Sequence, residues 1–192
     1  MVSGGVAISS PHVKRYGTLC CLFADQDGVV YGLTAGHVLT NGFAREAIPV
    51  HQAHYRRDRR ISHATKQVRR HSERDAIAFP LADDLIISAG VLTFNQIRGV
   101  SMPEVGQVLT KWGAGTGSTQ ARVRALDHGY IDIEPLEVGS TLAYAGGDSG
   151  SAWISESTST LVGLHLGSDP IGFGKALRMD EILPLLDLTL LV

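Results

Sequence analysis

Cysteine is scarce in this sequence of 192 residues: there are two, Cys20 and Cys21, and they are adjacent. Neighbouring cysteines cannot form a disulfide that links distant parts of a fold, so we expect a core stabilised by packing alone and a reduced, cytoplasmic setting. The first residues also lack a basic start, an apolar stretch and a small-residue cleavage site, so no secretion signal is expected.

Excess charge and long apolar runs are lacking as well. The formal net charge is −2, and no run reaches the roughly 20 apolar residues of a membrane-spanning helix. Hydrophobic residues make up 44% of the chain, which excludes a disordered protein and fits one domain or two small lobes sharing a core. There is no phosphate-binding loop and no dinucleotide fingerprint, so no cofactor is expected.

Helical periodicity is almost absent before the C-terminal end, and short β-type runs between turn signals take its place. The dipeptide Asp27-Gly28 separates the first two runs and is typical of a tight hairpin. Many short strands at this spacing favour a β-barrel or sandwich. The runs are 16–24, 28–34, 75–81, 107–112, 122–126, 130–133 and 161–166.

The C-terminal end differs, because Asp180 can cap a helix and an apolar stripe follows it to Leu190. Pro184 is compatible only with a position near the start of that helix. A boundary between two lobes is expected around 88–101.

Residues 51–74 are strongly basic, with eight Lys or Arg against two acids and thus a local charge of +6. The segment has few apolar residues and is interpreted as a solvated loop joining strands. The alternative is a docking surface for an acidic partner, although a nucleic acid is not expected. The histidines His51, His54 and His63 lack the cysteine or carboxylate spacing of a zinc site, so no metal is expected.

Three motifs occur in the order histidine, aspartate, serine. In LTAGHV a β-type run ends at His37, in RDAIAF Asp75 begins an apolar strand, and in GGDSGSAW glycines flank Ser149. A serine hydroxyl is a weak nucleophile at neutral pH and needs an adjacent base, for which a neutral imidazole is suited. An aspartate can hold that imidazole in the required tautomer.

These motifs resemble those of the trypsin-like serine peptidases of the chymotrypsin fold, over roughly 16–188. The resemblance implies that Ser149 is the nucleophile, His37 the general base and acid, and Asp75 the orienting carboxylate, with Asp83 as the alternative. It also implies an oxyanion hole made by the backbone N–H groups of Gly147 and Ser149.

The expected fold is therefore all-β, with two antiparallel six-stranded barrels and a short C-terminal helix, in a single domain spanning 1–192. The first barrel is expected at about 12–88, the second at about 101–178 and the helix at about 180–190.

A second resemblance is to the catalytic domain of plant Narrow-Leaf trypsin-like proteins and their bacterial relatives. It is carried by DAIAFPLADD from Asp75, by KWGAGTGST from Lys111 and by the C-terminal end. It implies an intracellular protease that assembles into a homo-oligomer. A protein or peptide is the expected substrate, and control by a regulatory protein partner is the alternative to control by self-association.

The substrate pocket is expected beside Ser149. The resemblance places its floor near Ala143, where no acid is present to favour Lys or Arg. Strict alternation would put His165 and Gly167 on one face of a strand that ends at Ser168. By similarity to glutamyl endopeptidases and viral cysteine proteases of this fold, His165, with Ser168, would favour Glu or Gln. Alternatively, His165 is a structural histidine bonded to the backbone.

Asp148 needs a partner if its carboxylate is buried. Secreted relatives pair this residue with a freshly cleaved N-terminus, and removal of Met1 could expose Val2 as such an ammonium group. The preferred interpretation is that Asp148 bonds to backbone N–H groups or a basic side chain. The chain is thus expected to be a serine endopeptidase acting through an acyl-enzyme. The rival is a catalytically weak binding or scaffold module that docks an acidic partner through its basic loop.

Overall fold

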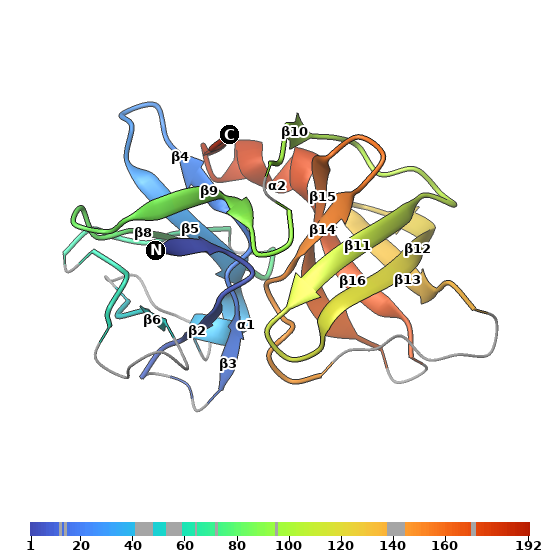
Figure 1. Cartoon of the computed structure of the whole chain (residues 1–192), viewed down its shortest axis with the longest axis horizontal. Coiled ribbons are helices and arrows are strands. Elements are labelled where there is room, and N and C mark those ends of the chain that lie inside the picture. Colours follow the sequence, from blue (N-terminus) through green and yellow to red (C-terminus); the bar gives the residue numbers. More distant parts are fainter. Residues whose placement is uncertain are drawn as a thin grey trace.

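The computed structural model describes residues 1–11, 13, 15–40, 48–52, 59–63, 65–71, 73–94, 96–137, 145–169 and 172–192. Two β-rich lobes lie side by side, and a short C-terminal helix packs at their junction (Figure 1). None of the helices in these residues is long and apolar enough to cross a membrane. The all-β class with a short C-terminal helix, expected from the sequence, is confirmed.

The second lobe is a closed six-stranded barrel with the ladder order β15-β14-β11-β12-β13-β16, closed by pairing of β16 with β15. In β12, Thr119, Ala121 and Val123 are buried while the residues between them are exposed, as a half-buried strand requires. The short β10 (Gly99–Val100) adds to β15 in parallel. The barrel strands are β11 (Val108–Gly113), β12 (Gly117–Asp127), β13 (Tyr130–Pro135), β14 (Ala152–Ser155), β15 (Thr160–Ser168) and β16 (Gly174–Arg178).

The first lobe is built from three sheets, ordered β17-β4-β5-β8-β7, β3-β2-β6 and β1-β9. It takes in strands before the expected start near residue 12, and it extends past residue 88 to the end of β9. Its strands are β1 (Val2–Gly4), β2 (Ala7–Ser9), β3 (Tyr16–Thr18), β4 (Leu22–Ala24), β5 (Val30–Ala35), β6 (His51–Gln52), β7 (Arg69–Arg70), β8 (Ala76–Pro80), β9 (Ile87–Val91) and β17 (Thr189–Leu190).

The C-terminal helix α2 (Met179–Leu185) is shorter than the helix expected at about 180–190. Pro184 lies near its end, not near its start, and Asp180 is in the first turn, not at the cap. The chain leaves the helix through Asp187, which has a φ of 52°, and then forms β17 against β4. The apolar stripe continues beyond the helix because Leu188 and Leu190 are buried by that strand pairing.

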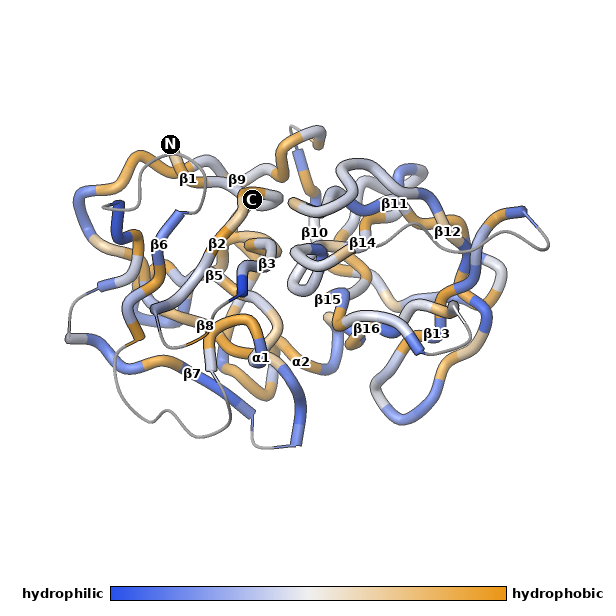
Figure 2. The backbone as a smooth tube through the Cα atoms, turned by 90° about the horizontal axis from the view of Figure 1, so that it is seen from below, coloured by the Kyte–Doolittle hydropathy of each residue, from blue (hydrophilic) through white to orange (hydrophobic). Residues whose placement is uncertain are grey.

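A continuous apolar cluster joins the two lobes. It combines Phe23 and Leu33 of the first lobe, Ile154 and Leu164 of the second, and Ile182 of α2. Apolar segments accordingly run through the strands of both lobes in Figure 2. Burial of this shared core fixes the two lobes relative to each other, and with them the residues at their boundary.

Two arginines of the basic segment also connect distant elements. Arg69 contacts the Asp25 carboxylate at 2.5 Å and donates to the backbone oxygens of Leu186 and Asp187 after α2. Arg74 donates to the His128 backbone oxygen (2.7 Å) in the second lobe. The interpretation of 51–74 as only a solvated loop is therefore incomplete. Its residues Arg56 and Arg57 lie outside the described residues.

Candidate active site

His37 is held by Asp75 at the end of a strand pair. β5 runs into the one-turn helix α1 (Gly36–Leu39), and β8 begins immediately after Asp75. Because β5 and β8 pair with Ala35 opposite Ala76, the two side chains meet. The His37 ring Nδ1 lies 2.5 Å from Asp75 Oδ2, and the His37 backbone N–H donates to Oδ1 at 2.9 Å.

The carboxylate of Asp75 is kept ionised. Burial raises its pKa. The hydrogen bonds and charge of His37, together with the charge of Arg70, lower the pKa by more than burial raises it, so that the net shift is downward. A carboxylate that accepts a hydrogen bond from the Nδ1–H group of a neutral imidazole leaves Nε2 as the basic nitrogen of that ring. Asp83, the alternative, does not reach His37: its side chain is 79% exposed and lies near His63 and Lys66.

Ser149 lies in a turn of the second lobe that rests directly on β3 of the first. Its Oγ donates to the Leu166 backbone oxygen at 3.0 Å, and no hydrogen bond joins it to His37 within the part of the chain that the structure describes. The segments that carry them are nevertheless close: a Cβ added to Gly17 would touch both the Val38 side chain, next to His37, and the Ser149 backbone oxygen. The serine turn and α1 are therefore neighbours across Gly17.

The two backbone N–H groups expected in an oxyanion hole, those of Gly147 and Ser149, have no acceptor among the described residues. Gly147 has a φ of 109°, and a Cβ there would strike the ring of Tyr16, so only glycine fits. Gly150, with a φ of 92°, is equally restricted, because its Cβ would collide with Thr34 Oγ1 and the Thr18 backbone oxygen.

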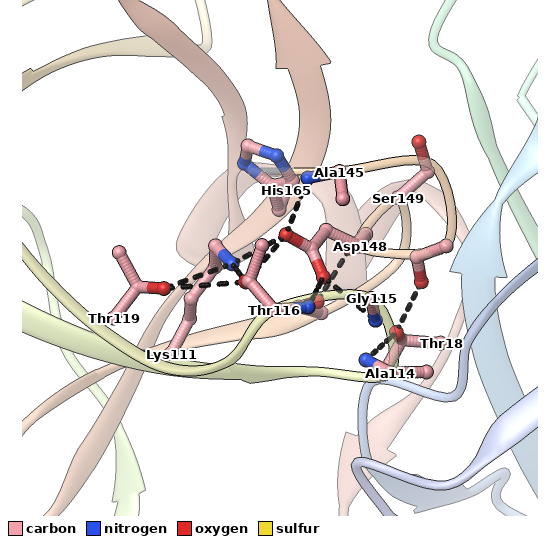
Figure 3. Close-up of polar contacts among 12 residues, drawn as sticks. Thr18, Lys111, Ala114, Gly115, Thr116, Thr119, Ala145, Asp148, Ser149 and His165 are labelled. Carbon is pink, nitrogen blue, oxygen red and sulfur yellow. Dashed lines mark hydrogen bonds and ion pairs between the residues drawn. The ribbon is translucent and has the colours of Figure 1, made fainter. Parts of the chain in front are cut away.

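Asp148 is buried in an ion pair with Lys111 (Figure 3). Lys111 Nζ lies 2.9 Å from Asp148 Oδ2, and the two side chains are 0% and 1% exposed. The carboxylate also accepts from the backbone N–H groups of Gly115, Thr116 and Ala145, at 3.0, 2.9 and 3.1 Å, and from Thr116 Oγ1 at 2.7 Å. Every contact in this set comes from the second lobe.

Opposing effects act on both members of the pair. Burial raises the pKa of Asp148, but the bonds from Thr116 and the charge of Lys111 outweigh it and lower the pKa. Burial lowers the pKa of Lys111 more than Asp148 raises it. The hypothesis that Val2 pairs with Asp148 is wrong, because the Val2 N–H donates to the Ile86 backbone oxygen (2.8 Å) within the β1–β9 region.

His165 is almost completely buried, and its ring Nδ1 lies 3.3 Å from the indole Nε1 of Trp153, which donates to it. Burial first, then the charge of Lys111, lower the pKa of His165 to about 3, so the ring is neutral. The expected alternation fails here, because a register shift between His165 and Gly167 interrupts the pairing of β15 with β16. Ser168 is exposed at the end of β15.

The remaining predicted site residue, Ala143, lies outside the described residues. No group of three or more histidine, cysteine or carboxylate side chains that could hold a metal ion occurs in the described ranges.

Three residues of this site escaped the sequence analysis: Lys111, Trp153 and Thr18. Lys111 could have been noticed, because a lysine inside an apolar strand is unusual. Alternation would bury either Thr110 or Lys111, but not both. Both residues are buried. Thr18 and Trp153 have ordinary β-strand surroundings, and nothing in the sequence distinguishes them.

Comparison with known structures assigns the fold. The chain is similar to Thermobifida fusca protease A (TM-score 0.73, 16% identity, 100% and 98% of the two chains covered) and to Nocardiopsis protease (0.72, 16%, 100% and 99%). It is also similar to a glutamic-acid-specific serine protease that uses a histidine triad in substrate binding (0.71, 21%, 99% and 100%). The chain has the chymotrypsin-like double-barrel fold. No protein-family model and no curated protein sequence matches it.

Proposed function

We propose that this protein is a serine endopeptidase that hydrolyses peptide bonds through an acyl-enzyme. The observation that carries the proposal is the two-point contact between His37 and Asp75, at 2.5 and 2.9 Å, beside a serine turn with two N–H donors that find no acceptor in the described part of the chain. This arrangement supplies a base, a nucleophile and an oxyanion site at the boundary of the two lobes.

The reaction follows from these roles. Ser149 Oγ leaves its bond to Leu166, turns to His37 and attacks the peptide carbonyl carbon while His37 Nε2 takes the hydroxyl proton. The carbonyl oxygen becomes an oxyanion that accepts from the N–H groups of Gly147 and Ser149. His37 then gives the proton to the departing amine as the C–N bond breaks. Water, deprotonated by His37, releases the acyl group and restores Ser149.

A fluorophosphonate probe tests this function, because it labels only an activated serine. Labelling of Ser149 in the wild-type protein is expected, with loss of labelling in Ser149→Ala and in His37→Ala. Peptide cleavage should disappear in the same variants. A folded wild-type protein that takes up no probe and cleaves no peptide would contradict the proposal and favour the binding or scaffold module.

The substrate preference proposed for the site is Gln or Glu before the scissile bond. His165 supports it, because the Gly150 N–H after the nucleophile donates to the His165 backbone oxygen at 2.7 Å. The indole N–H of Trp153 donates to Nδ1, so the neutral ring carries its proton on Nε2. A neutral ring lacks the positive charge that favours a carboxylate, so we expect Gln to be cleaved faster than Glu.

A peptide library with a varied residue before the scissile bond tests this preference separately. Wild-type protein is expected to cleave after Gln most rapidly, and His165→Leu is expected to lose that preference while Ser149 still reacts with the probe. Preferential cleavage after small aliphatic residues would leave His165 a structural residue and would not affect the proposed peptidase activity.

Regulation by a protein partner or by self-association in the cytoplasm also belongs to this proposal. The free, fully buried thiols of Cys20 and Cys21 support a reducing setting. Light scattering of the purified protein, with and without peptide substrate, tests the self-association.

A further inference from the structure

Thr18 is a fully buried residue of β3, and each of its polar atoms forms a hydrogen bond in or beside the serine turn. Its Oγ1 donates to the Gly147 backbone oxygen at 2.6 Å and accepts from the Ala114 N–H at 2.9 Å (Figure 3). Its backbone N–H donates to the Ser149 backbone oxygen at 2.8 Å. Its own backbone oxygen accepts from Thr34 Oγ1 at 2.8 Å.

These bonds fix peptide planes on both sides of the oxyanion donors. The Gly147 oxygen belongs to the plane between residues 147 and 148, which lies between the N–H of Gly147 and the N–H of Ser149. The Ser149 oxygen belongs to the plane between residues 149 and 150, immediately after the Ser149 N–H. Gly147 has no side chain of its own to limit its rotation, so the bond from Thr18 supplies a constraint that its sequence lacks.

The same hydroxyl links the serine turn to the turn between β11 and β12. Ala114 is next to Gly115, and the N–H groups of Gly115 and Thr116 both donate to Asp148. A single buried hydroxyl of the first lobe therefore contacts two segments of the second lobe. Losing it would leave the Ala114 N–H without its acceptor and the Gly147 oxygen without its donor.

We propose that the Thr18 hydroxyl is a positioning group: it holds the Gly147–Asp148 peptide plane, which joins the two donor peptides, and thereby orients the N–H groups of Gly147 and Ser149 toward an oxyanion. The inference rests on the proposed peptidase function, because it assigns Gly147 and Ser149 to the oxyanion hole. Thr18 does not touch the substrate. It acts through Gly147, and its effect is expected in the transition state and not in substrate binding.

The test compares Thr18→Val, which keeps the shape and loses the hydroxyl, with Thr18→Ser, which keeps the hydroxyl. Losing one oxyanion donor costs about 100- to 1,000-fold in rate, so a mispositioned donor should lower kcat of Thr18→Val by about 10- to 100-fold. KM should change little, and Thr18→Ser should regain most of kcat. The rates are expressed per active site titrated with the fluorophosphonate probe, so that unfolded protein does not contribute.

Two inhibitors separate positioning from general damage. A peptide aldehyde forms a tetrahedral adduct with an oxyanion, whereas the corresponding peptide alcohol binds without one. Thr18→Val should weaken aldehyde binding by about the same factor as kcat and leave alcohol binding unchanged. Equal weakening of both inhibitors, or wild-type kcat in Thr18→Val, would overturn the proposal.

Failure of the two proposals is distinguishable. A wild-type protein that the probe does not label contradicts the peptidase function itself. In that case the amide NMR resonances of Gly147 and Ser149 still test the positioning role, since Thr18→Val should shift or broaden both while Thr18→Ser does not. Unchanged resonances would count against Thr18. If Thr18→Val does not fold, Thr18→Cys, with its weaker hydrogen bonds, is expected to give an intermediate loss.

Discussion

The two lobes hold the serine turn by different chemistry. From the second lobe the turn is held by neutral hydrogen bonds to Leu166 and His165 and, in addition, by charge, through Asp148, Lys111 and the N–H groups that surround the carboxylate. From the first lobe it is held by neutral hydrogen bonds from Thr18 and by the close approach of β3. Both supports are buried, but only the charged one contains groups that can titrate.

The difference matters because the two kinds of support fail differently. A buried ion pair that loses one partner leaves an uncompensated charge, at a cost of about 3–5 kcal/mol. A neutral hydrogen bond contributes about 0.5–1.5 kcal/mol to stability. The charged support should therefore dominate the stability of the turn, while the neutral support, which bonds to the peptides of Gly147 and Ser149 themselves, should dominate its geometry.

The largest effect is expected for Lys111→Met, which removes the cation from Asp148 while nearly conserving volume. Asp148 then remains buried with only hydrogen-bond donors around it, and the free energy of unfolding should fall by about 3–5 kcal/mol. Urea denaturation followed by tryptophan fluorescence measures this loss. Labelling of Ser149 by the probe should fall with it, because Asp148 immediately precedes the proposed nucleophile.

The matched control combines Lys111→Met with Asp148→Asn. The asparagine oxygen can still accept from Gly115 and Thr116 but carries no charge, so the double variant should be more stable than Lys111→Met alone. If the two variants are equally stable, the charge of Asp148 is not the source of the loss. The charged support would then be no different in kind from the neutral one.

The second prediction concerns pH and the neutral His165 beside the charged support. Its pKa in the folded protein is about 3, whereas the ordinary value for histidine is about 6.5. Between these values the unfolded chain binds a proton that the folded protein does not, so stability should fall as the pH falls, by at most about 1.4 kcal/mol per pH unit. Lys111, Asp148 and His37 all contribute to the field at this ring.

Measurements at pH 6.5 and pH 4.5 isolate this effect, because the carboxylates with lowered pKa values titrate below that range. The wild-type protein is expected to lose roughly 2–3 kcal/mol between the two pH values. His165→Gln should show a clearly smaller loss. An identical slope in both proteins would mean that another group carries the acid sensitivity.

Most of the fold could be predicted from the sequence, because alternating burial and turn residues act locally. The run before His37, the strand after Asp75 and the hairpin at Asp27-Gly28 all lie where the sequence places them. The C-terminal end was less predictable. Its apolar stripe is compatible with one long helix and also with the short helix, turn and strand that the structure contains. Pairing of β17 with β4, which the local sequence does not show, decides between the two.

The contacts around the candidate site were predictable only in part. His37 and Asp75 meet because the strand before His37 pairs with the strand after Asp75. The two strands and the residues at their ends can be recognised in the sequence. Thr18 and Gly147 are 129 residues apart, and their hydrogen bond depends on how one lobe rests on the other. The partner of Asp148 was restricted to backbone N–H groups or a basic side chain, but burial of Lys111 decides which cation it is.

The smallest effect is expected at the outer end of the neutral support. Thr34→Val removes the hydroxyl that donates to the Thr18 backbone oxygen at 2.8 Å and keeps the shape of the side chain. The free energy of unfolding should fall by about 1 kcal/mol, and that loss should be the same at pH 6.5 and pH 4.5, because no charge is involved. Thr34→Ser, which keeps the hydroxyl, is the control. A loss in Thr34→Val that grows on acidification would show that the first-lobe support is coupled to the buried charges, and the contrast between the two lobes would then not hold.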